Sequence, residues 1–508
     1  MHDIIVIGAG SAGAVVAARA SENPALNVLL IDAGPDYGDA RNLPPDLVNG
    51  HNNSYRDHDW GFSHAPTAGR SVPFPRGRVV GGSSAVNTCI ALRGVPEDYD
   101  GWADLGNPQW SWASVLPAFK RLERDLDFPD TSWHGDAGPI PIRRYPRDEL
   151  LPQHAAFLDA ARTLGYDTCP DANDPWGSGA GPQPMNKLGQ LRVSTALGYL
   201  AGARARPNLQ IMPDTLACRL RFRGRRCVGV EVTTQGGERT LLDARLVVCS
   251  AGAIQTPPLL MRSGIGAEDG VRAIGVDPLV DLPGVGANLC DHPALAVVCT
   301  ARSPHLTRTD NPLIQTILRY TAPGSSLRND LQIEQLSFAG RRGDARFAIA
   351  AVLEYQEGRG YLRVTSADPE VPPQIENRFC ADPRDRAKLA LCLRDALAFT
   401  RAEPLTDLID SVVFPDPARS QDLEALEQLC ARHAGSGYHP CGTARMGPAT
   451  DRQAVVDEWG RCHGVEGLAV ADASIMPFVP RANTNLTCIM IGERVGEWLR
   501  THPAWYGL

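Results

Sequence analysis

The sequence predicts a mixed α/β fold, α+β over the whole chain, in which a mainly parallel sheet domain is interrupted by a second, antiparallel domain. The chain opens with a strand-like run (3–7), a glycine turn, an Ala/Val-rich helical pattern to about residue 21, and a second apolar run (27–31). Distant strand-like segments could complete the same sheet: 209–212, 216–222, 228–234, 245–249 and 468–471. The intervening stretches instead mix helical patterns (154–164, 384–402, 420–433) with extended ones (330–338, 346–354, 361–365).

Length and composition limit the class of protein. The 508 residues exceed what one hydrophobic core usually supports. The net charge is −8 and no Lys/Arg-rich run stands out, so no nucleic-acid partner is expected. The 13 Cys are scattered without CxxC pairs, which favours reduced thiols, and we predict no metal site. No leader-like segment and no apolar run of about 20 residues is visible, which favours a soluble, cytoplasmic protein without a membrane span.

The glycine turn carries a phosphate-binding pattern. Gly8 permits a tight turn, Gly10 lets the backbone approach a pyrophosphate, and Gly13 lets the following helix pack close to the strand. The free N–H groups and the positive dipole at the start of that helix attract phosphate. Asp32, at the end of the second strand, is placed to accept hydrogen bonds from ribose hydroxyls. These features predict a Rossmann-like dinucleotide site without identifying the dinucleotide.

Five later segments point to a family. They read GRVVGGSSAVNTCIALRGVPEDYD (77–100), GAIQTPPLLMRSGIG (252–266), YHPCGTARMG (438–447), VADASIMP (470–477) and NTNLTCIMIGE (483–493). In this order they resemble the glucose–methanol–choline (GMC) oxidoreductase family along the whole chain. VADASIMP and HGDAGPIPI (134–142) resemble bacterial members that act on hydroxymethylfurfural and aryl alcohols. The resemblance implies an FAD-dependent alcohol oxidase or dehydrogenase.

The resemblance also implies where FAD binds. The FAD-binding domain would comprise residues 1–145, 201–299 and 434–508, and the substrate-binding domain residues 146–200 and 300–433. Some relatives tether the flavin covalently through a His one position before Asn87; Val86 stands there, so FAD is expected to bind non-covalently. The implied cofactor contacts are Gly8, Gly10, Ser11, Ala12, Gly13, Asp32, Ala33, Arg78, Val80, Gly82, Ser83, Asn87, Cys218, Ser250, Ala251, Gly252, Asp472, Ala473, Asn483, Thr484 and Asn485.

Two further features near the C-terminus bear on FAD binding. Asp472 follows a short apolar run, and the resemblance implies that it holds the ribityl and pyrophosphate region of FAD; the alternative is that it caps a turn before Ser474. A final helix is expected to begin near Leu486, with Thr484 or Asn485 as its cap. The dipole of this helix would stabilise negative charge on the reduced flavin.

Alcohol oxidation requires a base. A hydroxyl that loses its proton makes the carbon a better hydride donor, and a neutral imidazole can accept that proton near pH 7. Among 12 His, His439 lies in a glycine-rich segment, and Pro440 restricts it toward extended conformations. In the family the His of this motif is catalytic, and its partner, a His or an Asn, follows at the spacing of Asn483, 44 residues on. Asn485 is the alternative partner, and His292 in NLCDHP (288–293) is interpreted as structural.

The predicted reaction oxidises a small primary alcohol, aromatic or furanic, to an aldehyde, and oxygen or another electron acceptor then reoxidises FAD. Choline is disfavoured because no carboxylate-plus-aromatic cage is visible. The alternatives are lyase chemistry of the photodecarboxylase type, a non-catalytic protein that keeps FAD for stability, and an NAD-dependent dehydrogenase. Candidate cavity residues are Trp60, Phe62, Phe338, Leu353 and Tyr355.

Overall fold

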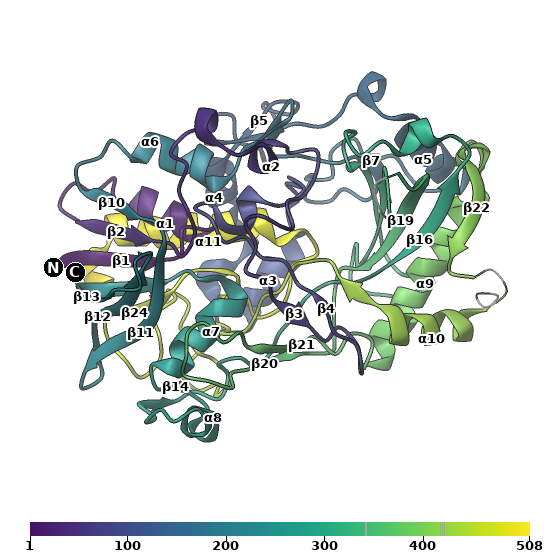
Figure 1. Ribbon diagram of the computed structural model, residues 1–508. Helices are drawn as coiled ribbons and strands as arrows, with labels where there is room; N and C mark the ends of the chain where they lie inside the picture. Colours follow the sequence, from purple (N-terminus) through teal and green to yellow (C-terminus); the bar gives the residue numbers. More distant parts are fainter. Residues whose placement is uncertain (341–342, 417, 419, 421) are drawn as a thin grey trace.

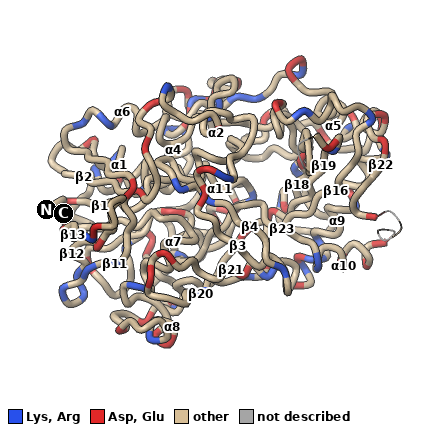
Figure 2. The backbone as a smooth tube through the Cα atoms, in the orientation of Figure 1, with Lys and Arg blue, Asp and Glu red and all other residues tan. Residues whose placement is uncertain are grey.

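Two large sheets lie in different halves of the molecule, and the two ends of the chain meet beside the first sheet (Figure 1). The computed structural model describes residues 1–340, 343–416, 418, 420 and 422–508. Acidic and basic residues are interspersed along the backbone of both halves (Figure 2). Among the helices of these residues, none combines the length and apolarity needed to span a bilayer. All 13 Cys are free thiols and are buried.

The first sheet gathers the strands predicted at the start, middle and end of the chain. Its order is β10-β2-β1-β13-β12-β11, with β24 beside β13. β13 changes partners along its length: residues 239–243 pair antiparallel with β12, whereas residues 244–249 pair parallel with β1. The prediction that these distant segments form one sheet is confirmed. The strands are β1 (His2–Ile7), β2 (Val28–Ile31), β10 (Leu209–Met212), β11 (Thr215–Arg223), β12 (Arg226–Thr234), β13 (Arg239–Cys249) and β24 (Leu468–Val470).

The first and last long helices of this half pack on each other. α1 (Gly13–Ala20) contacts α11 (Thr484–Thr501) closely at Gly492, where an added Cβ would lie 2.6 Å from the carbonyl oxygen of Ala12. The predicted start of α11 near Leu486 is wrong by two residues. Asn483 is its N-cap, so Thr484 and Asn485 lie inside the first turn rather than capping it. This leaves their side chains free for other contacts.

The second sheet is antiparallel throughout, as predicted. Its order is β22-β16-β19-β18-β17-β7, with β23 beside β16. Helices α5 (Pro152–Thr163), α9 (Pro383–Phe399) and α10 (Leu423–His433) match the predicted helical patterns, although residue 421 of the predicted 420–433 segment lies outside the described residues. The strands are β7 (Gly179–Pro182), β16 (Pro293–Ala301), β17 (Ile314–Tyr320), β18 (Leu331–Leu336), β19 (Arg346–Leu353), β22 (Ile409–Phe414) and β23 (Gly435–Ser436).

The predicted domain boundaries stay a prediction. β16 and β23 pair within the second sheet, although their residues were largely assigned to the FAD-binding domain. The other helices are α2 (Pro45–Val48), α3 (Pro96–Asp104), α4 (Trp112–Leu122), α6 (Ala201–Ala203), α7 (Gly252–Arg262) and α8 (Glu268–Ala273). The short strands are β3 (Ser63–His64), β4 (Val72–Pro73), β5 (Glu123–Asp125), β6 (Ile140–Ile142), β8 (Lys187–Leu188), β9 (Leu191–Arg192), β14 (Ile265–Gly266), β15 (Val280–Asp281), β20 (Tyr361–Arg363) and β21 (Gln374–Glu376).

Candidate active site

A cavity of about 570 Å³ is lined by residues from both large sheets. The carboxyl ends of parallel strands β1 and β2 open onto it, which is where α/β proteins bind dinucleotides. The predicted site residues that line it are Gly8, Gly10, Ser11, Ala12, Asp32, Ala33, Gly82, Ser83, Asn87, Ser250, Ala251, Gly252, His439, Asp472, Ala473, Asn483, Thr484 and Asn485.

Four predicted cofactor contacts do not line the cavity. Gly13 has a packing role, because an added Cβ would lie 1.9 Å from the carbonyl oxygen of Gly8. Val80 is buried and packs in the core of the first half of the molecule. Arg78 is exposed, and its Nε donates to the carbonyl oxygen of Ala33 at 3.2 Å.

Cys218 is the fourth of these residues. Its Sγ lies 3.2 Å from Thr233 Oγ1, while its neighbours Leu216 and Ala217 line the cavity instead. Of the candidate substrate-contacting side chains, Trp60 and Phe62 line the cavity, whereas Phe338, Leu353 and Tyr355 do not. Sequence pattern located the right segments here and missed which residue of each faces inward.

The part of the cavity beside β1 and β2 fits a dinucleotide. Asp32 accepts hydrogen bonds from the backbone N–H groups of Ala9 and Gly34, both at 2.8 Å. Burial raises the pKa of Asp32 to about 7, and these two bonds oppose the shift. At Gly252 no described atom lies within 4 Å of where a Cβ would be, so the bare backbone borders open space. A flat or phosphorylated group can approach the chain there.

Asp472 lines the cavity but is already engaged by the protein. Its carboxylate accepts from the backbone N–H of Gly252 at 2.8 Å, from Thr256 Oγ1 at 2.7 Å and from the backbone N–H of Ser474 at 2.8 Å. Burial raises its pKa, and these bonds oppose the rise. Asp472 therefore caps the turn before Ser474 and fixes the start of α7 against β24.

The start of α11 reaches the glycine turn at the opposite end of the chain. Ser11 Oγ donates to Asn485 Oδ1 at 2.9 Å. Within the described chain, Asn485 Nδ2 and Asn483 Oδ1 are buried without hydrogen-bond partners. Buried polar atoms seldom stay unpaired. Both atoms belong to cavity-lining residues, and a polar ligand there would satisfy them.

His439 lies between two side chains. Asn483 Nδ2 is 3.0 Å from His439 Nε2, and His292 Nδ1 is 2.9 Å from His439 Nδ1. The predicted pairing of His439 with Asn483 rather than Asn485 therefore matches the geometry. His292 was interpreted as structural, but its fully buried ring is one of the two hydrogen-bonding neighbours of His439.

A buried carboxylate that sequence reasoning missed shapes the His439 loop. Asp291 Oδ1 accepts from the backbone N–H groups of His292 at 2.7 Å and His439 at 2.8 Å. Asp291 Oδ2 accepts from Ser436 Oγ at 2.5 Å. Burial raises the pKa of Asp291 to about 6, opposed by these bonds. An acid directly before a His in NLCDHP was the available signal, but its partner on the 436–439 loop is distant in sequence.

The surroundings of His439 favour the neutral imidazole. Burial, the His292 ring and the Arg76 guanidinium hold the pKa of His439 well below its usual range. Arg76 is fixed nearby, because its Nη1 donates to the carbonyl oxygen of Tyr438 at 2.9 Å. Burial lowers the pKa of His292 to about 3. A neutral imidazole facing a cavity can accept a proton at neutral pH.

Both halves of the chain match one family. The N-terminal GMC oxidoreductase profile matches residues 2–294, and the C-terminal profile matches residues 356–492. The chain belongs to the GMC oxidoreductase family. Members of this family are FAD-dependent oxidoreductases, so the family, the enzyme class and the cofactor predicted from sequence are confirmed.

Several relatives of this GMC oxidoreductase match it over almost its whole length. A 5-(hydroxymethyl)furfural oxidase from Methylovorus sp. is 35% identical, covering 99% of both chains. An oxygen-dependent choline dehydrogenase from Staphylococcus saprophyticus is 33% identical, covering 98% of this chain and 95% of the relative. The crystal structure of pyridoxine 4-oxidase from Mesorbium loti is 29% identical and superposes with a TM-score of 0.91, covering 99% and 100% of the two chains.

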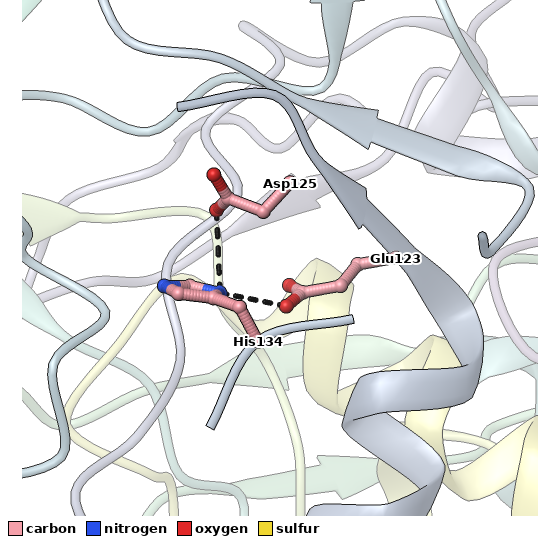
Figure 3. Close-up of side chains that lie close together, drawn as sticks. All are labelled: Glu123, Asp125 and His134. Carbon is pink, nitrogen blue, oxygen red and sulfur yellow. Dashed lines mark hydrogen bonds and ion pairs between the residues drawn. The ribbon is translucent and has the colours of Figure 1, made fainter. Parts of the chain in front are cut away.

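A separate cluster in this GMC oxidoreductase contains ligand-type side chains. Glu123, Asp125 and His134 lie close together away from the cavity (Figure 3). His134 Nδ1 lies 2.7 Å from Glu123 and 3.2 Å from Asp125, and its Nε2 lies 2.9 Å from Asp171. Both ring nitrogens thus face carboxylates. This arrangement suits a protonated imidazole, because a metal ligand needs a free nitrogen lone pair.

Two arginines complete the cluster. Arg93 pairs with Glu123, and Arg144 pairs with Asp125 and with Asp171. Although burial alone would lower the pKa of His134, the hydrogen bonds that its ring donates to Asp171 and Glu123 raise it. Arg144 also reaches Asp127 at 3.4 Å, and we interpret the cluster of carboxylates, two arginines and His134 as an ion network.

Proposed function

We propose that this enzyme oxidises a primary alcohol to an aldehyde, with His439 accepting the hydroxyl proton and Asn483 positioning the substrate oxygen. The observation that carries the proposal is the His439–Asn483 contact at 3.0 Å, on the wall of a cavity that also contains the dinucleotide-binding glycine turn. Bound FAD supplies the hydride acceptor of the reaction. The proposed cofactor-contacting residues are those predicted residues that line the cavity.

The hydrogen bonds of His439 define which nitrogen is the base. Asn483 Nδ2 can only donate, so His439 Nε2 accepts and carries no proton. His439 Nδ1 then carries the proton and donates to His292 Nδ1. This tautomer leaves the basic lone pair on the side of Asn483. An alcohol hydroxyl that inserts between the two side chains replaces this bond: it donates to His439 Nε2 and accepts from Asn483 Nδ2.

The cavity and the relatives both support the proposed substrate class. The cavity wall contains Trp60, Phe62 and Tyr438, which suit a flat or apolar alcohol. The similarity to a 5-(hydroxymethyl)furfural oxidase supports a small furanic or aromatic primary alcohol. Photodecarboxylase-type chemistry is less well supported, because it does not need the paired His439 and Asn483.

The decisive test is anaerobic. The purified holoenzyme is mixed in the dark with a panel of primary alcohols, and loss of flavin absorbance near 450 nm is followed. We expect benzylic or furanic alcohols to bleach the flavin, and His439→Ala to slow bleaching by at least about 100-fold with FAD retained. His305→Ala, an exposed His remote from the cavity, is the matched control. Unchanged bleaching in His439→Ala would refute the proposal.

Admission of oxygen then separates an oxidase from a dehydrogenase. Rapid return of the flavin absorbance with hydrogen peroxide formation assigns oxygen as the electron acceptor. Slow return in air, with fast return after addition of a quinone dye, assigns another acceptor. Both outcomes leave the role of His439 intact, because alcohol oxidation precedes this step.

A further inference from the structure

The part of the cavity wall formed by the four central strands of the second sheet, β16 to β19, is apolar except at two positions of β18. Strands β16, β17, β18 and β19 contribute Gln332 and Glu334 as the polar residues among an otherwise aliphatic set. Gln332 and Glu334 are two residues apart in a strand, so they face the same side. The aliphatic set is Ala294, Leu295, Ala296, Ile314, Leu336, Ala350 and Val352.

The strand register places Glu334 in the outer part of this wall. Gln332 pairs with Val352, and Val352 pairs on its other side with Ala294, which lies two residues after His292 at the start of β16. Glu334 lies one step further out, about 7 Å along the strand, in the row of Ala350 and Ala296. The small side chains of this row leave space in front of the Glu334 carboxyl group. A substrate whose reacting end is at His439 would therefore direct its far end toward Glu334.

Burial of the Glu334 carboxyl group is energetically unfavourable. Glu334 is 8% exposed, and burial raises its pKa to about 7. Among the described residues, the one interaction found to oppose this shift is a hydrogen bond from Gln332 Nε2 at 2.9 Å. Burying a carboxyl group without a cation is unfavourable. A hydrogen-bond donor on the substrate would offset that cost, and a cationic donor would do so best.

We propose that Glu334, oriented by Gln332, is a recognition subsite for a hydrogen-bond donor at the end of the alcohol remote from the reacting carbon. The shared chemistry is an N–H or O–H donor, either a protonated amine or a second hydroxyl. The subsite rests on the proposed alcohol oxidation for its catalytic consequence, although binding tests it separately. It adds a carboxylate to the cavity that the sequence did not reveal.

A set of para-substituted benzyl alcohols tests the subsite. The probes are 4-methylbenzyl alcohol, 1,4-benzenedimethanol, 4-(aminomethyl)benzyl alcohol and 4-(hydroxymethyl)benzoate, each with the holoenzyme. We expect kcat/KM for the aminomethyl probe to exceed that of the methyl probe by about 10- to 100-fold, the effect of one charge-assisted hydrogen bond. The second hydroxyl should give a smaller preference, and the carboxylate should be rejected.

Two variants separate recognition from folding. Glu334→Gln keeps the shape and should abolish the preference for the aminomethyl probe while leaving the methyl probe within about 3-fold. Glu354→Gln changes the same residue type at a buried carboxyl group that directly follows β19, lies near His292 and does not line the cavity. The ratio of aminomethyl to methyl should survive in Glu354→Gln. An unchanged ratio in Glu334→Gln would overturn the subsite.

The ratio of the two probes also has a defined pH dependence. The amine stays protonated across neutral pH, whereas the Glu334 carboxylate forms as pH rises past about 7. The ratio should therefore rise with pH in the wild type and stay flat in Glu334→Gln. Taking a ratio cancels ionisations that affect both probes alike. The other ionisable groups that line this cavity are Asp32, Tyr55, Arg76, Arg262, His433, Tyr438, His439, Asp472 and Cys488, and Glu354 lies behind it.

Failure of the subsite differs from failure of the proposed reaction. If no alcohol bleaches the flavin, the proposed reaction is wrong, and the subsite is then tested with 4-methylbenzylamine, which has no hydroxyl to oxidise. Titration calorimetry should give a Kd at least about 10-fold lower for the wild type than for Glu334→Gln. Equal Kd values would overturn the subsite whatever the catalytic result.

Discussion

Burial, His292 and Arg76 act together on a single residue, His439. They keep its imidazole neutral, which suits a group that must accept a proton. Asp291 contributes differently, because it holds the backbone of the His439 loop rather than its ring. The charge on Arg76 and the geometry set by Asp291 are therefore separable. The effect of the Arg76 charge should appear in the pH profile of flavin reduction. The effect of the geometry set by Asp291 should appear in the size of the rate constant.

The pH dependence of flavin reduction tests the charge effect. Protonated His439 cannot accept a proton, so the rate constant should fall only as pH drops through a pKa lying well below 6.5. Stopped-flow bleaching with 4-methylbenzyl alcohol measures this between pH 5 and 9. Arg76→Met removes one cause of the lowered pKa and should move the midpoint to higher pH. A wild-type midpoint at or above 7 would contradict the interpretation.

At the scale of elements, the ion network around His134 ties β5 to two loops. Glu123 and Asp125 belong to β5, His134 follows it, and Asp171 lies on a distant loop. A buried network of this kind is costly to break because removal of one partner leaves the others unpaired. The network lies outside the cavity, so its loss should reduce stability more than catalysis.

His134→Ala should destabilise the protein by about 3–5 kcal/mol. The raised pKa of His134 means that its contribution is complete below pH 6.5 and is lost as pH rises through the folded-state pKa. Because the pKa values of Glu123 and Asp171 are lowered, the contribution of these two carboxylates to stability is complete above about pH 4.5 and is lost at more acidic pH. Guanidinium denaturation at several pH values, with His305→Ala as control, should show the largest difference between pH 5 and 6. An equal difference at pH 9 would argue against a protonated His134.

At the scale of the whole molecule, the cofactor cavity links the two sheets. A ligand that binds only the folded chain raises its stability by mass action. Because Val86 lines the cavity and offers no nucleophile, FAD should be released by acid precipitation and remain in the supernatant. The apoprotein should melt at a lower temperature, and added FAD should restore the Tm in a concentration-dependent way. A yellow pellet would show that FAD is covalently attached.

Features of the fold and the site could be predicted from the sequence where the residues that form them lie close together along the chain. The glycine turn and Asp32 sit within one β-α-β unit, so spacing alone located them, and the family motif located His439 and Asn483. Glu334 could not be found in this way, because which face of β18 borders the cavity depends on its register with β19. The roles of Asp291 and His292 were missed because their partner, His439, lies 147 residues or more further along the chain.

The hydrogen bond between Ser11 and Asn485 joins positions 474 residues apart, and the two termini lie together (Figure 1). A ribosome must therefore release almost the entire polypeptide before the pocket for FAD can close. Premature termination that removes only α11 would leave most of both sheets encoded, yet no cofactor would be retained. Lengths of this chain that stop before α11 should be colourless, so the yellow colour of the holoenzyme reports that α11 has been made and has reached the glycine turn.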